Sequence, residues 1–86
     1  MLINYIDTAM EQAVYEIIED DGTYWGEIPH FQGVWANHKT LEGCRRELRE
    51  TLGDWIALRL RLNLGIPIIA NIDLNHLDNL YEVQHV

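Results

Sequence analysis

The 86-residue chain has little of what disulfide-rich, membrane-spanning or metal-binding proteins are built from. Its single cysteine, Cys44, excludes an internal disulfide framework and a four-cysteine zinc site. Its apolar runs are a few residues long, whereas a membrane span needs roughly 20. The first residues carry Asp7 and Glu11 without a basic flank, unlike a signal peptide. We expect a cytoplasmic protein without membrane association, folded as one domain over residues 1–86.

Basic residues are also scarce, because six lysines and arginines stand against fourteen aspartates and glutamates, a formal net charge of −8. Proteins that bind nucleic acids neutralise phosphates with lysine and arginine, so the balance argues against direct DNA or RNA binding. A basic protein partner is compatible, since opposite potentials favour association. The alternative is an acidic surface that serves solubility alone.

The amino-terminal half predicts a helix followed by a β-meander. Apolar residues recur every three or four positions over residues 2–12, as in a short amphipathic helix, and we assign residues 1–12 to this segment. The runs VYEIIE and TYWGEI flank Asp21-Gly22 and predict a β-hairpin, because glycine readily adopts the positive φ of such a turn. Residues 34–37 predict a third strand.

A long helix is predicted from the capping residue Thr40 to about Asn63, with Gly65 ending it. Six apolar side chains lie along one line of this helix and are expected to pack on the sheet: Leu41, Cys44, Leu48, Leu52, Trp55 and Leu62. Residues 66–72 predict a fourth strand, and residues 73–86 a tail or a short helix. The order α-β-β-β-α-β indicates an α+β fold, a small and mainly antiparallel sheet with the long helix on one face.

The carboxyl half of the long helix carries a second apolar edge that the sheet cannot cover. It consists of Ile56, Leu58, Leu60 and Leu64. A small monomer rarely exposes such a patch, so we expect a homo-oligomer, either a dimer or a tetramer. The alternative is that the first helix or the tail folds over this edge.

No pattern indicates catalysis. The acidic residues are not expected to converge as a two-metal nuclease requires. The four histidines lack the spacing of a metal site, and no glycine-rich phosphate loop is present. Cys44 lies on the packing face of the helix, which favours a buried thiol over a nucleophile. We expect no enzyme, no metal and no cofactor.

Aromatic and acidic residues gather instead on the predicted sheet. Tyr24 and Trp25 are neighbours in one strand, so one of them must point away from the helix-covered face. Tryptophan beside acidic residues suits a protein-binding hot spot. The alternative is that the first helix covers the outward aromatic ring. The candidate binding residues are Glu16, Glu19, Asp20, Asp21, Trp25, Glu27 and Trp35.

The run from Tyr15 to Leu60 resembles the amino-terminal domain of the HicB antitoxin family. The matching features are the DG.Y.GEIP hairpin, the GVWA strand, the TLE..R..L.E.L.DW helix and the Leu-Gly-Ile-Pro exit. Together they place a HicB-like core over residues 14–69.

The resemblance implies a partial ribonuclease-H-like fold and a protein that neutralises a small basic toxin, HicA, which cleaves mRNA. Many members also carry a carboxy-terminal DNA-binding domain. The residues after Pro67 are too few for a helix-turn-helix, so we expect no such domain and no direct DNA binding. The alternative function is that of an orphan, oligomeric HicB-like protein without a toxin, and a degenerate nuclease ranks last.

Overall fold

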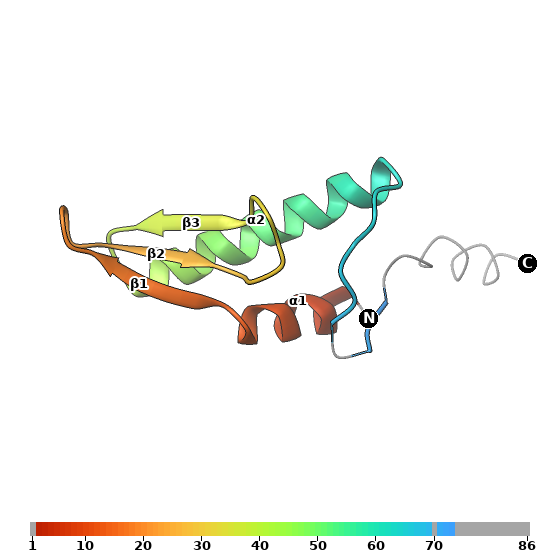
Figure 1. The fold of residues 1–86 in the computed structure, drawn as a ribbon, viewed down its shortest axis with the longest axis horizontal. Helices are drawn as coiled ribbons and strands as arrows, with labels where there is room; N and C mark the ends of the chain where they lie inside the picture. The colour runs from red at the N-terminus through yellow and green to blue at the C-terminus, as the bar shows by residue number, and fades with distance from the viewer. Residues whose placement is uncertain (1, 70, 74–86) are drawn as a thin grey trace, which may run out of the picture.

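The computed structural model describes residues 2–69 and 71–73 and shows a three-stranded sheet with two helices (Figure 1). The elements in chain order are α1 (Leu2–Glu11), β1 (Val14–Ile18), β2 (Thr23–Glu27), β3 (Trp35–His38) and α2 (Leu41–Arg61). The strands pair as an antiparallel meander in the order β1-β2-β3. Helix α2 covers one face of this sheet, which confirms the predicted small α+β architecture.

The long helix begins as predicted and ends differently. The Thr40 side chain caps α2 by accepting a hydrogen bond of 3.0 Å from the Gly43 amide. At the other end, Asn63 and not Gly65 takes the left-handed conformation, with a φ of 56°. The amide of Asn63 donates to the Leu60 carbonyl and that of Leu64 to the Arg59 carbonyl, which is the Schellman pattern. An asparagine tolerates this conformation because its short polar side chain lowers the steric cost.

The predicted fourth strand over residues 66–72 does not join the sheet. Within residues 66–69 and 71–73 the only β-pairing is an isolated bridge between Ile69 and Ile72. Asn71, with a φ of 66°, turns the chain back on itself here. Pro67 has no amide proton, and its carbonyl accepts a hydrogen bond from the Tyr5 hydroxyl, so neither group is available to a neighbouring strand. Most of the predicted tail, residues 74–86, lies outside the described residues.

The core lies between α2 and the sheet, along a line that differs from the predicted one. The buried side chains of α2 follow a spacing of four residues: Cys44, Leu48, Leu52 and Ile56. Leu41 and Leu62, which were expected on this line, are exposed, and Trp55 is half-buried. Leu41 is the first residue of α2 and lies at the edge of the contact with β1 and β2, whereas Leu62 is the C-cap residue at the other end of the helix.

Two glycines let α2 lie close to the sheet. A Cβ atom on Gly26 of β2 would lie 2.8 Å from Cε1 of Tyr15 and 3.0 Å from Sγ of Cys44. A Cβ atom on Gly43 of α2 would overlap the imidazole ring of His38, at the end of β3. Neither site has room for a side chain, so these two positions need the absence of a Cβ atom.

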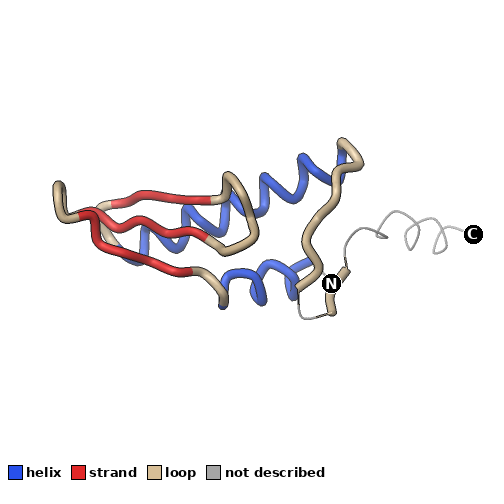
Figure 2. Tube along the Cα trace, viewed as in Figure 1, coloured by secondary structure: helices blue, strands red, loops and turns tan. Residues whose placement is uncertain are grey.

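Helix α1 packs against α2 and lies beyond the end of the sheet (Figure 2). Its Tyr5 and Ala9 are buried, and the Tyr5 ring meets the ring of Phe31 edge-on, with centroids 6.3 Å apart. Asp7 of α1 pairs with Arg49 of α2 at 2.6 Å. The Tyr5 hydroxyl also ties α1 to the segment that follows α2, through the Pro67 carbonyl.

We expect alkaline pH to loosen α1 through Tyr5. Burial raises the pKa of the Tyr5 hydroxyl from 10.0 to about 12. The folded state therefore holds this proton more tightly than the unfolded state does, so stability is full below pH 10 and falls as the pH rises towards 12. Urea unfolding should show a loss of about 1–2 kcal/mol over this interval that Tyr5→Phe lacks. An identical pH profile for the two proteins would contradict the assignment.

Candidate protein-binding surface

One face of the sheet is turned away from α2, and its side chains follow from the strand register. Glu16 pairs with Trp25, Trp25 with Asn37, and Glu27 with Trp35. Because side chains alternate along a strand, these residues share one side, opposite the buried Gly26 and Ala36. We call this side the outer face; its residues are Val14, Glu16, Ile18, Thr23, Trp25, Glu27, Trp35 and Asn37.

The outer face is not covered by α1. Among the described residues, α1 contacts α2 and no strand, and it lies past the end of the sheet (Figure 1). The expectation that either Tyr24 or Trp25 points outward is met by Trp25, because Tyr24 lies on the side of α2. The alternative, in which the first helix covers the outward ring, does not occur.

Two tryptophans stack on each other at the centre of the outer face. The rings of Trp25 and Trp35 lie 4.6 Å apart between centroids, with 8° between their planes. The Trp25 indole Nε1 donates a hydrogen bond of 3.3 Å to Oε1 of Glu27. Trp35 stays 50% exposed. The pair therefore presents a flat apolar surface to solvent, and the Glu27 carboxylate is hydrogen-bonded to one of its rings.

The predicted acidic residues divide into two groups. Glu16 and Glu27 lie on the outer face, each directly opposite a tryptophan on the neighbouring strand. Glu19, Asp20 and Asp21 lie in the turn between β1 and β2 and are exposed. The first group therefore shares a surface with the tryptophan pair, whereas the second group extends its negative charge beyond the hairpin.

Asp21 also has a structural role in the turn. Its Oδ1 accepts hydrogen bonds from the Thr23 hydroxyl at 2.7 Å and the Thr23 amide at 3.0 Å. These two bonds, the hydroxyl first, hold the pKa of Asp21 below its usual value, so the carboxylate stays charged. Asn37 donates to the Thr23 hydroxyl and to the Tyr24 carbonyl. Sequence reasoning missed the contribution of Thr23 and Asn37, although the strand register would have placed both beside Trp25.

Positive charge is kept behind the sheet. All five arginines belong to α2, and the single lysine, Lys39, lies between β3 and α2. The outer face consequently has carboxylates and no basic side chain. Among the described residues, Asp7 forms an ion pair with Arg49 and Glu47 lies 3.9 Å from the His38 imidazole, whereas neither Glu16 nor Glu27 has a basic partner.

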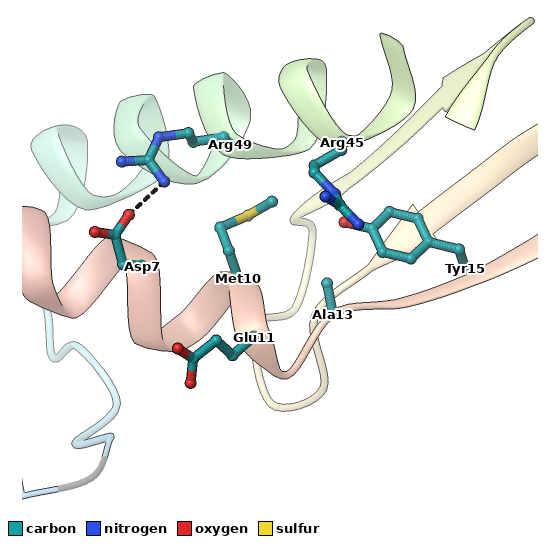
Figure 3. A pocket seen from close by; sticks show the side chains of 7 residues that line it. All are labelled: Asp7, Met10, Glu11, Ala13, Tyr15, Arg45 and Arg49. Carbon is teal, nitrogen blue, oxygen red and sulfur yellow. Dashed lines mark hydrogen bonds and ion pairs between the residues drawn. The ribbon is translucent and has the colours of Figure 1, made fainter. Parts of the chain in front are cut away.

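A hollow lies between α1, α2 and the start of β1 (Figure 3). It has a volume of about 340 Å³. The Asp7–Arg49 pair closes one end, and the guanidinium of Arg45 lies 6.0 Å from the centroid of the Tyr15 ring. The lining contains both acidic side chains, such as Glu11, and the two arginines. The hollow therefore has no net charge that would favour either an anion or a cation.

Neither a metal site nor a reactive thiol is formed in the described part of the chain. Among these residues no group of three or more histidine, cysteine, aspartate or glutamate side chains could hold a metal ion. Cys44 is buried, and its thiol faces the Ala36 carbonyl at 3.5 Å. Burial raises the pKa of this thiol, and the charge of Glu47 raises it further. The reactive form of cysteine is the thiolate, and a raised pKa disfavours it. Cys44 therefore serves in packing rather than as a nucleophile. No described helix is long and apolar enough to cross a membrane.

The predicted self-association edge is changed in composition. Ile56 is only 1% exposed and belongs to the core, and Leu60 is half-buried against it. Leu58 and Leu64 are exposed, as expected, and Leu62 joins them. Leu62 is the C-cap residue of α2, and Leu58 lies one turn before it, so the two leucines are neighbours at the carboxyl end of the helix. The exposed edge is therefore Leu58, Leu62 and Leu64.

Comparison with known proteins agrees with the fold. A family model described as UPF0150-like matches residues 4–67. The crystal structure of TTHA0281 from Thermus thermophilus superposes with a TM-score of 0.76, at 36% sequence identity. The match covers 84% of this chain and 89% of that chain. No curated protein matches the sequence.

We expect the tryptophan pair to contribute little to the free energy of unfolding, because Trp35 stays half-exposed in the folded protein. Trp35→Ala should lower the free energy of unfolding by about 1 kcal/mol, the value of a stacked aromatic pair. Phe31→Ala, which removes a buried ring, should cost about 3–5 kcal/mol. Urea denaturation measures both. Equal costs would mean that Trp35 belongs to the core.

Proposed function

The chain belongs to the UPF0150-like family, which is grouped with the HicB-like toxin–antitoxin proteins, and on this basis we propose that it is an antitoxin-like binding protein. Its partner would be a small basic toxin of the HicA type that cleaves mRNA. In this proposal the three strands and α2 form the partial ribonuclease-H-like core that the HicB resemblance implies. The protein itself would act by binding, without catalysis.

The observation that carries this proposal is the outer face. It joins an exposed tryptophan pair to two carboxylates that have no basic partner in the described residues. A toxin that binds RNA must present a cationic surface to phosphates. Glu16 and Glu27 would occupy that surface, and Trp25 and Trp35 would supply the apolar contact area that holds the complex. Glu19, Asp20 and Asp21 would steer the approach.

The test first asks whether a neighbouring gene encodes a small basic protein, which is then purified and assayed for RNA cleavage. Adding the acidic chain should stop cleavage, and association should slow several-fold between low salt and about 0.5 M salt, because added ions screen the attraction. The double substitution Glu16→Gln and Glu27→Gln should weaken inhibition at least ten-fold.

Glu11→Gln with Glu50→Gln is the matched control. It removes the same charge from two exposed glutamates on the helices, so it should leave inhibition within about two-fold of the wild type. Loss of inhibition by both double variants alike would mean that total charge acts and the outer face does not. An RNA-cleaving partner that the wild type fails to inhibit would end the proposal.

Self-association is a separate proposal, favoured by the exposed leucines at the end of α2. Leu58, Leu62 and Leu64 are 45%, 55% and 45% exposed. Burying one leucine contributes roughly 1.5–3 kcal/mol, and two-fold symmetry doubles each contact. This surface would hold a dimer or a tetramer, and it is the feature expected of an orphan oligomer that has no toxin.

We expect Leu62→Asp to separate the oligomer into folded units of half the mass or less, as measured by light scattering. Leu62 is a cleaner position than Leu60, which is half-buried against the core. Leu41→Asp is the control, because Leu41 is similarly exposed at the opposite end of α2, and its mass should equal that of the wild type. A monomeric wild type would refute this interface.

A further inference from the structure

We propose that the tryptophan pair of the outer face is a receptor for an arginine side chain. This inference rests on the proposed function, since the arginine would belong to the basic partner. It goes further by naming the group that is recognised and the atoms that recognise it.

The stacking geometry leaves aromatic surface available to a cation. Trp25 and Trp35 lie nearly parallel, so each ring uses one face for the other, and Trp35 still exposes half of its surface. Indole is the aromatic group that attracts cations most strongly, through the negative charge of its π face. Within the described residues the pair does not use this attraction internally, because every arginine lies on α2 behind the sheet.

The carboxylates stand where a charge over the rings would need them. Glu16 is directly opposite Trp25 and Glu27 directly opposite Trp35, so each pair of Cβ atoms is about 4.5–5.5 Å apart. Glu27 is held against Trp25 by the hydrogen bond from the indole Nε1 to Oε1. A group that stacks on either ring therefore comes within reach of a carboxylate.

This combination selects arginine over lysine. A guanidinium is planar, stacks on aromatic rings and donates two parallel hydrogen bonds to one carboxylate, whereas an ammonium is a compact, strongly hydrated point charge. It also disfavours two other occupants. Nucleic-acid bases stack on aromatic rings, but their phosphates would meet Glu16 and Glu27. A second copy would bring the same two carboxylates against their own kind.

The test needs no toxin. The three indole N–H signals of ¹⁵N-labelled protein are followed by NMR while a short, otherwise neutral peptide with two arginines is added. Trp25 and Trp35 should shift in a saturable way, whereas Trp55, whose ring lies beneath the Arg59 guanidinium at 4.7 Å, is the internal reference and should not. The lysine peptide should bind about three-fold or more weakly, and the peptide with uncharged, planar citrulline should not bind measurably.

Two double variants locate the effect. Glu16→Gln with Glu27→Gln should weaken arginine-peptide binding at least five-fold, and Glu11→Gln with Glu50→Gln should leave it unchanged. Equal binding of the arginine and lysine peptides, or tighter binding of a single-stranded RNA to the same indoles, would overturn the inference. If the arginine peptide binds as expected but the protein does not inhibit the toxin, the receptor stands and the proposed function falls. If the toxin is inhibited while the two peptides do not differ, this inference alone falls.

Discussion

The close contact between α2 and the sheet is the constraint on which the rest of the molecule depends. It exists because Gly26 and Gly43 have no Cβ atom, so that Tyr15 and Cys44 fill the space over the first and His38 fills the space over the second. One face of the three-stranded sheet packs against α2, and no helix of the described residues lies on the other face. Helix α1 is used instead to cover the side of α2 that extends beyond the strands. The open outer face follows from this shortage of covering elements.

The same arrangement separates the charges. The arginines lie along α2, where Arg49 pairs with Asp7, and Arg59 lies over the Trp55 ring and donates a hydrogen bond to the Gly65 carbonyl. The carboxylates of the strands lie on the other side of the sheet without such partners. The net charge of −8 is therefore unevenly distributed, and among the described residues no helix covers the surface that joins the strand carboxylates to the tryptophan pair. This separation favours an approach by a cationic partner from the outer face.

Local signals in the sequence predicted the elements, whereas details set by tertiary contacts escaped them. The Asp21-Gly22 turn and the Thr40 cap act within a few residues, so both were found. The outward position of one aromatic ring followed from alternation, but choosing Trp25 over Tyr24 required the strand register. Ile56 was assigned to an exposed edge because a helical wheel contains no information on how far the strands reach. Residues 66–72 were read as a strand because their composition is apolar, although the Tyr5 bond to Pro67 arises from a contact 62 residues away along the chain.

The position of Cys44 has a consequence for how the molecule opens. It is the only thiol of the chain, and its sulfur lies at the contact between α2, Gly26 and the Ala36 carbonyl. A reagent that modifies thiols cannot reach it unless the helix lifts from the strands. The rate of modification under native conditions therefore measures the free energy of opening at this contact, and a partner bound on the far side of the sheet would change that rate only by stabilising the strands themselves. The rate at which Cys44 is modified therefore reports on binding at the opposite face of the sheet.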